Sequence, residues 1–357
     1  MIEPAHVFAT GVGCPLGLTP RAAFAAVAAG VRRFVEIDDI VDAAGEPARG
    51  CRLQSLAGDD PFERALWFAR RAVAQAAEAL GSATKVPVPV YLAVPPAAKG
   101  AGRTQPLVNA LSEAMPASVN LQWSDQSLVA EGRASGAIAL AAALGALRSA
   151  PLVLVGGLDC LVAGDALREL SRHNRLLGRR NCDGRLPGEA AAFVLLGRPG
   201  SLPRASALGR VQAVACSREP LPFAGESASE AAGLTRVLST LRGQWPDRVD
   251  EVVAAQSNER FFATELATAY LRNVELMPEP LRVRSLADVL GDCGASAFPL
   301  GLAWALSAFD SRPRWREPLA SALVVSSSDT GAVGGALVTA ATHSRSSLGP
   351  RLTARGS

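Results

Sequence analysis

The sequence predicts an α/β fold built from two halves with a similar order of elements. Apolar, strand-like runs alternate with helix-like segments along the 357 residues. Hydrophobic residues make up 49% of the chain and charged residues 19%, which favours a compact globular protein over a disordered one. The order of elements is similar on either side of residues 200–206, so we expect a first half at 1–203 and a second half at 204–341. We expect the polar segment 342–357 to be a mobile tail.

The two helices expected first have recognisable start signals. Thr19 suits an N-cap, and Pro20 suits the first position of the Ala-rich helix that follows. Asp60 and Glu63 have the spacing of a capping box, which predicts that a longer helix begins there. Gly81 is a suitable end for this second helix, because glycine adopts the left-handed conformation that often terminates helices.

The remaining elements follow from apolar runs and their lengths. Residues 134–147 carry no charged side chain, so we expect a helix that is buried on all sides. The other expected elements, in chain order, are strands at 6–13, 90–94, 151–157, 190–196 and 208–216, a helix at 226–241, a strand at 251–255, helices at 259–272 and 294–309, and strands at 319–325 and 334–338.

Composition excludes several classes of function. A formal net charge of +3 is small for this length and predicts no nucleic-acid partner. With three histidines and no CxxC pair among six cysteines, we expect no metal site, and we expect no cofactor. No apolar stretch reaches the length of a membrane span, and the first residues lack the pattern of a secretory signal. Scattered cysteines without such a signal favour the reducing cytoplasm.

Five segments together resemble the β-ketoacyl synthases. The segment Glu131-Gly132-Arg133-Ala134-Ser135-Gly136, at the start of the uncharged helix, resembles the turn that carries the catalytic cysteine in that family. The other four appear in the family's order: Val7 to Gly17 resembles the opening strand and turn, Val153 to Asp159 the Gly-Gly turn, Asp183 to Ala191 the Gly-Glu-Gly-Ala motif, and Gly291 to Ala297 the Gly-His segment. We interpret Glu189, within the fourth segment, as structural.

This resemblance implies a thiolase-like fold of two duplicated halves, layered α-β-α-β-α, and a dimer. It also implies which positions would carry the chemistry. Arg133 stands where the family has its cysteine, Gln256 where it has the first histidine and Asp292 where it has the second. Arginine stays protonated and cannot attack a thioester. The three histidines, at 6, 173 and 343, fall outside both places, so we expect no catalytic residue and no condensing activity from this chain alone.

Two readings of Arg133 follow. The first is an ion pair with Asp292 that fills the former site, because a cation at a helix N-terminus needs a compensating partner. The second is that Arg133 binds a carboxylate or phosphate of a ligand. Ser135 and Cys293 are candidates to line the same site, and we interpret both as small packing residues rather than nucleophiles.

The leading functional hypothesis is a catalytically silent partner subunit, similar to the chain-length factors that pair with an active ketosynthase. The implied partners are that ketosynthase and an acyl carrier protein, with a homodimer when the chain is alone. The implied setting is bacterial fatty-acid-like or polyketide biosynthesis. The alternatives are an acyltransferase, decarboxylase or hydrolase with a rebuilt site, and a stand-alone acyl-binding protein. An open, acyl-sized pocket favours the alternatives, and a filled site favours the partner subunit.

Overall fold

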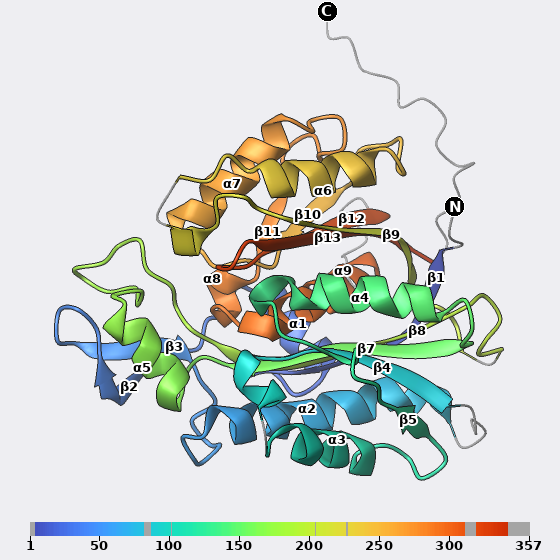
Figure 1. Ribbon diagram of the computed structural model, residues 1–357, viewed down its shortest axis with the longest axis horizontal. Helices are drawn as coiled ribbons and strands as arrows, with labels where there is room; N and C mark the ends of the chain where they lie inside the picture. Colours follow the sequence, from blue (N-terminus) through green and yellow to red (C-terminus); the bar gives the residue numbers. More distant parts are fainter. Residues whose placement is uncertain are drawn as a thin grey trace, which may run out of the picture.

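Five layers of helices and sheets make up the structure. The computed structural model describes residues 4–81, 87–100, 102–203, 205–225, 228–310 and 319–341. Figure 1 shows two sheets separated by a helical layer that contains α4 (Ser135–Ala146) and α9 (Ala297–Asp310). α2 (Pro61–Ala77) and α3 (Thr104–Glu113) cover the outer face of one sheet, and α6 (Ala232–Arg242) and α7 (Arg260–Leu271) cover the other. The predicted α-β-α-β-α layering is confirmed.

The two sheets are continuous through one strand pair, β1 with β9. The hydrogen-bonded order of strands is β11 (Val283–Ser285), β10 (Glu251–Ala254), β12 (Ser321–Ser327), β13 (Ala332–Ala340), β9 (Gly209–Arg218), β1 (Ala5–Gly13), β8 (Glu189–Gly197), β7 (Leu152–Cys160), β4 (Pro87–Ala93) and β5 (Asn120–Gln122), with β6 (Leu128–Val129) also on β4.

The predicted duplication is visible in the order of strand pairing. From β1 outward, β8 is antiparallel to β1, β7 is antiparallel to β8, β4 is parallel to β7 and β5 is parallel to β4. The strands outward from β9 repeat these directions. β13 is antiparallel to β9, β12 is antiparallel to β13, β10 is parallel to β12 and β11 is parallel to β10. The proposed division at 203/204 falls between β8 and β9, and the tail expected at 342–357 lies outside the described residues.

The predicted starts of the first two helices are confirmed, and each has the side-chain cap expected from the sequence. Thr19 Oγ1 accepts a hydrogen bond from the Ala22 backbone N–H at 3.3 Å, and α1 (Pro20–Ala28) follows. Asp60 caps α2 by accepting from the N–H groups of Phe62 and Glu63. One predicted boundary is wrong: α6 begins at Ala232 instead of residue 226, because Ala231 has a left-handed conformation with φ of +54°.

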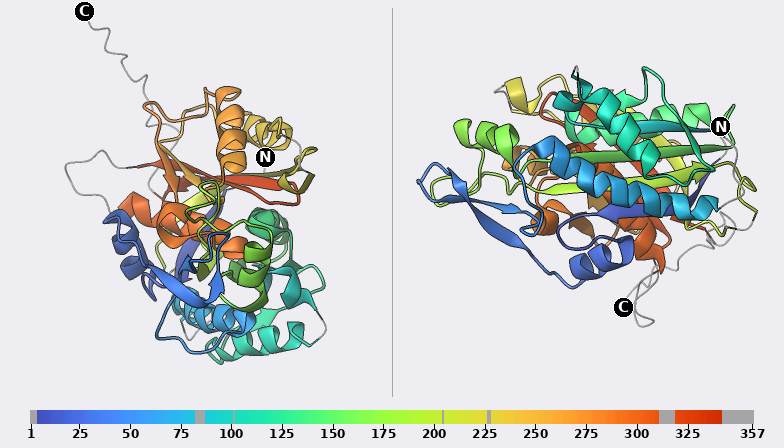
Figure 2. Two further views of the ribbon diagram at one scale, coloured as in Figure 1. Left: turned by 90° about the vertical axis from the view of Figure 1, so that its left-hand side faces the viewer. Right: turned by 90° about the horizontal axis from the view of Figure 1, so that it is seen from below.

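Several short elements were not expected from the sequence. They are the hairpin β2 (Phe34–Val41) and β3 (Pro47–Cys51), the helices α3, α5 (Gly164–Arg172) and α8 (Ala287–Leu290), and the strands β5, β6 and β11. Figure 2 shows that the β2–β3 hairpin extends from one end of the molecule, near α5. The strands β5, β6 and β11 have only two or three residues, too few for a periodic pattern to appear. The helix α3 does have buried residues at helical spacing, at Leu107, Ala110 and Leu111, and this pattern was missed.

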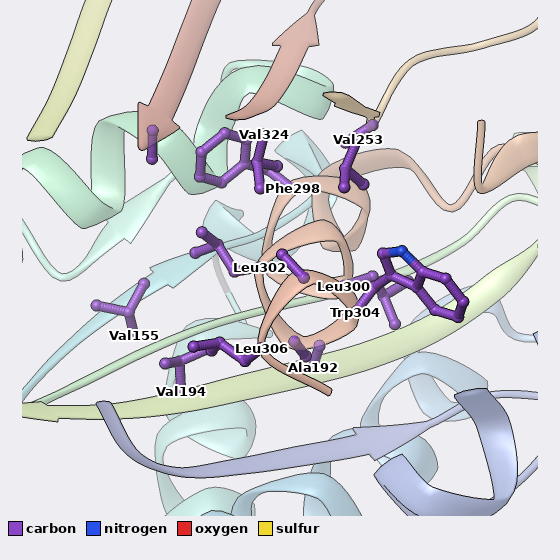
Figure 3. Packing of buried hydrophobic residues seen from close by; sticks show 14 of the residues in the cluster. Val155, Ala192, Val194, Val253, Phe298, Leu300, Leu302, Trp304, Leu306 and Val324 are labelled. Atoms are coloured by element: carbon purple, nitrogen blue, oxygen red, sulfur yellow. The ribbon is translucent and has the colours of Figure 1, made fainter. Parts of the chain in front are cut away.

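The central helix layer brings the two halves into one core. Side chains of α9 reach both sheets: Phe298 lies beside Val324 of β12, and Leu306 lies beside Val194 of β8 (Figure 3). The helices α4 and α9 pack closely at Gly136. A Cβ atom at this position would lie only 2.5 Å from Pro299 Cδ, so a larger residue would not fit. This close contact holds the N-terminal turns of α4 and α9 next to each other.

Candidate functional site

The candidate site lies where these two N-terminal turns meet. A 3₁₀ turn at Gly132–Ala134 carries Arg133 into α4, and Asp292 stands just before the equivalent turn, Gly294–Ser296, at α9. Both turns begin with a glycine in the left-handed region, with φ of +67° at Gly132 and +51° at Gly294. The turns therefore place one side chain from each half against the other.

The predicted ion pair between Arg133 and Asp292 is confirmed. Arg133 is 3% exposed, and its Nη1 lies 2.8 Å from Asp292 Oδ2. Its Nη2 lies 2.5 Å from Asp329 Oδ1, and its Nε donates to the Ser327 carbonyl at 2.9 Å. Burial alone would lower the pKa of Arg133, but the carboxylates of Asp329 and Asp292 raise it above the ordinary value. All three nitrogens of this guanidinium have protein partners.

Two further arginines, Arg185 and Arg175, contact the acidic residues around Arg133. Arg185 Nη1 lies 2.7 Å from the same Asp292 oxygen that Arg133 contacts, and its Nη2 lies 3.0 Å from Asp329 Oδ2. Arg175 makes a two-point contact with Glu259, at 2.9 and 2.8 Å, and also contacts Asp329. We call this set the ionic network: Arg133, Arg175, Arg185, Glu259, Asp292 and Asp329.

The formal charges of the ionic network cancel, with three cations and three anions. Burial alone would raise the pKa of Asp329, but Arg133 and Arg175 lower it below its ordinary value, so this carboxylate is ionised at neutral pH. Arg133 also lies over the Phe262 ring, with its Cζ 4.3 Å from the centroid. Such a balanced arrangement makes a cation tolerable at the start of a buried helix.

The other candidate residues predicted from the sequence lie around this network. Gln256 Nε2 donates to Ser327 Oγ at 3.4 Å, so it reaches the network only through Ser327. Ser135 Oγ accepts the Glu131 backbone N–H at 2.6 Å. Cys293 is 2% exposed, and burial raises the pKa of its thiol well above the ordinary value. That thiol is therefore protonated and a poor nucleophile.

Neither histidine in the described part of the chain, His6 or His173, belongs to the network, and His343 lies outside the described residues. Within the described ranges, no group of three or more His, Cys, Asp or Glu side chains is arranged to hold a metal ion. None of the described helices is long and apolar enough to cross a membrane.

Sequence reasoning missed Arg175, Arg185, Glu259 and Asp329. One signal was present: Asp329 is the only charged residue between positions 319 and 341, in a segment otherwise made of small and apolar residues. Arg185 also lies inside the segment that resembles the Gly-Glu-Gly-Ala motif. No sequence pattern indicated that Arg175 pairs with Asp329, since the two residues are 154 positions apart.

Comparisons with known proteins find similarity in structure and not in sequence. No family model and no curated protein matches the chain. A chain of AntDE:AntF, described as a type II PKS acyl-carrier protein in complex with its ketosynthase, matches with a TM-score of 0.77 and 12% identity, over 95% of this chain and 100% of that one. The ishigamide ketosynthase/chain length factor matches with a TM-score of 0.68 and 18% identity, over 95% and 99%.

A third match is the ketosynthase from module 6 of the bacillaene synthase of Bacillus subtilis 168. It has a TM-score of 0.72 and 14% identity, over 95% of this chain and 72% of that one. These matches cover nearly all of the chain at low identity, so they establish its architecture. The chain has the thiolase-like fold of the ketosynthases, and it is similar in structure to the ishigamide ketosynthase/chain length factor.

Proposed function

We propose that this chain is a catalytically silent ketosynthase homologue that acts as a partner subunit, in the manner of a chain-length factor. The observation that carries the proposal is the ionic network, which occupies the meeting point of the two turns. In this proposal Arg133, Gln256 and Asp292 are vestigial positions of a condensing site. The setting would be fatty-acid-like or polyketide biosynthesis, with an acyl carrier protein nearby.

The chemistry of condensation supports this proposal. A condensing enzyme needs a thiolate to carry the acyl chain, and donors that stabilise the enolate formed from the malonyl unit. Arg133 provides no nucleophile, and its guanidinium is held by Asp292, Asp329 and the Ser327 carbonyl. Three of the five N–H groups of this 3% exposed guanidinium have protein partners, so a substrate carboxylate would have to compete with Asp292 and Asp329 for it. The ionic network therefore favours the partner subunit over a rebuilt enzyme.

The partner surface that we propose is the outer edge of the first-half sheet. That sheet ends at β4, which is extended only by the three residues of β5 and the two of β6. Such short edge strands can be covered by a second subunit, and obligate interfaces of this kind bury well above about 2,000 Å². Asn120 and Gln122 of β5 are exposed. Two of the structural matches, a ketosynthase/chain length factor and a ketosynthase with its carrier protein, support this kind of assembly.

Co-expression tests the partner role. We expect a stable one-to-one complex with an intact ketosynthase encoded beside this chain, isolated by size exclusion. Gln122→Lys should weaken the complex, because a charge on β5 would be buried at the pairing edge. Glu113→Lys, at an exposed position of α3, is the matched control and should not weaken it. A strictly monomeric chain that binds no ketosynthase would defeat the proposal.

An activity assay tests the silence of the site. Incubated alone with acyl- and malonyl-carrier proteins, the chain should form no β-ketoacyl product, because no described side chain in the network can carry an acyl group as a thioester. An intact ketosynthase in the same assay is the positive control. Turnover in the ordinary enzymatic range, about 1 s⁻¹ or faster, would contradict the silent-subunit proposal.

A further inference from the structure

Two buried carboxyl groups lie outside the ionic network. Glu219, which follows β9, is 2% exposed, and Glu265 of α7 is 1% exposed. The three cations and three anions of the ionic network already balance one another, and none of the ion pairs between described residues includes either glutamate. A buried carboxylate without a counter-charge is costly, and such a group commonly takes up a proton instead.

Both carboxyl groups are bound to the same short segment, which leads into α6. Ser229 Oγ donates to Glu265 Oε1 at 3.4 Å, and the Gly233 backbone N–H donates to Glu219 Oε2 at 2.7 Å. The Ala231 N–H donates to Ser229 Oγ at 2.9 Å and fixes the segment between these two contacts. The helices α6 and α7 lie side by side on the outer face of their sheet (Figure 1), so the segment links the end of β9 to α7.

Each carboxyl group has one oxygen that these contacts do not satisfy. Glu219 Oε1 and Glu265 Oε2 are buried atoms without a hydrogen-bond partner in the described part of the chain. Buried polar atoms in folded proteins are almost always paired. One proton between the two groups would satisfy both oxygens, because a carboxylic acid donates it and a carboxylate accepts it.

We propose that Glu219 and Glu265 hold one proton between them at neutral pH, with Glu265 as the carboxylic acid and Glu219 as the carboxylate. Their hydrogen bonds decide which is which. Glu219 accepts an N–H group from the first turn of the 11-residue helix α6, where the helix dipole stabilises a negative charge. Glu265 accepts from the neutral hydroxyl of Ser229. The contact between the outer helices of the second half therefore depends on pH.

The groups around Glu265 support this assignment. Burial raises the pKa of Glu265 above its ordinary value, and the negative charge of Glu219 raises it further. The hydroxyls of Ser327 and Ser229 and the charge of Arg133 favour the ionised form, but Arg133 is already held by two carboxylates of the ionic network. The buried residues of α6 carry no charge: they are Gly233, Leu234, Val237, Leu238 and Leu241.

The shared proton makes stability fall as pH rises. The unfolded chain releases the Glu265 proton near the ordinary glutamate pKa of about 4.3, and the folded chain releases it at higher pH. Between these two values the folded state binds one proton more than the unfolded state, so each rise in pH favours unfolding. Once the proton is lost, two buried carboxylates repel each other where α7 meets the start of α6.

The first test is urea unfolding of the full chain over a range of pH, compared with Glu265→Gln. Glutamine has nearly the same shape, is neutral, and its amide donates at every pH. Above about pH 5, and until the pair ionises, the unfolding constant of the unchanged protein should rise about tenfold per pH unit relative to the variant, which is the slope for one proton. Glu275→Gln, at an exposed position beyond α7, is the matched control and should keep the full slope.

Glu219→Gln is the second variant if Glu265→Gln does not fold. Its amide can donate to Glu265 in place of the shared proton, and it removes the negative charge that opposes ionisation, so the slope should again fall. Infrared spectroscopy gives a direct readout. The spectrum of the unchanged protein minus that of Glu265→Gln should contain the carbonyl band of one protonated carboxyl group at neutral pH.

Three results would overturn the proposal. One is the absence of that infrared band from the difference spectrum. Another is an equal dependence of stability on pH in the unchanged protein and in the glutamine variants. The third is a loss of stability when sodium and potassium ions are replaced by choline at constant ionic strength, provided that Glu265→Gln removes this loss. A metal cation, instead of a proton, would then lie between the two carboxylates.

Discussion

Asp292→Ala is expected to lower the free energy of unfolding by about 3–5 kcal/mol, the usual cost of removing one partner from a buried ion pair. Asp292 is 1% exposed and neutralises two guanidinium groups through one oxygen, with Arg133 Nη1 at 2.8 Å and Arg185 Nη1 at 2.7 Å. Its other oxygen accepts the Gly294 backbone N–H at 3.0 Å. Truncation leaves two buried cations with less compensation and one unsatisfied N–H group.

Equilibrium unfolding in urea measures this loss. The matched control is Glu169→Ala, which removes a carboxylate from an exposed pair with Arg172 on α5. Exposed pairs of this kind contribute about 0.2–1 kcal/mol. A loss below about 1 kcal/mol for Asp292→Ala would show that the ionic network relaxes or admits water, and the interpretation of the site as filled would then be wrong.

Because one oxygen of Asp292 contacts both Arg133 and Arg185, we expect a change of Arg133 and Asp292 toward the condensing enzymes to be destabilising. Changing Arg133 to cysteine and Asp292 to histidine would recreate two residues of a condensing site. Arg185 would then lose its 2.7 Å partner, and Asp329 would lose one of the three arginines around it. The ionic network behaves as a unit, so substitution of one position toward the condensing enzymes leaves buried charges elsewhere.

Features that depend on residues close together in the sequence were predicted, and most features that depend on residues far apart were not. The starts of α1 and α2 were predicted because Thr19 and Asp60 cap helices within three residues of themselves. The contact of Arg133 with Asp292 was predicted because the family resemblance placed two turns together. The pairing of Arg175 with Asp329 was not, because no local pattern links residues 154 positions apart. The continuity of the two sheets through β1 and β9 was missed for the same reason.

The ionic network lies where equivalent turns of the two duplicated halves meet. The turn before α4 and the turn before α9 are equivalent in the two halves, and each contributes one member of the central pair. The other members come from loops of both halves: Arg175 and Arg185 from the first, Glu259 and Asp329 from the second. The network therefore links the two halves electrostatically, at the turns that the sequence resemblance assigns to a condensing site. This supports a stabilising role for the network in the proposed subunit.

Glu189→Ala should destabilise the chain by a similar amount, about 3–5 kcal/mol, for a reason that is independent of the candidate site. Glu189 of β8 is fully buried, and its two oxygens lie 2.8 and 2.7 Å from Nε and Nη2 of Arg64 in α2. Oε1 also accepts the Leu53 backbone N–H at 2.7 Å. The structure thus agrees with the structural interpretation of Glu189, since the carboxylate ties a sheet strand to the helix that covers it and to the loop before that helix.

A double-mutant cycle with Arg64→Met separates the ion pair from the rest of this effect. Arg64 also donates to the carbonyls of Leu53, Leu56 and Gly58, so the double variant Arg64→Met, Glu189→Ala should not regain full stability. It should nevertheless be less destabilised than the sum of the two single changes, because removing both charges leaves no uncompensated ion in the core. Glu113→Ala, in the exposed pair with Arg70, is the control and should change stability by less than about 1 kcal/mol. Strict additivity of the two single changes would contradict a direct Arg64–Glu189 interaction, since residues in one ion pair are expected to show a coupling energy of about 0.5–3 kcal/mol.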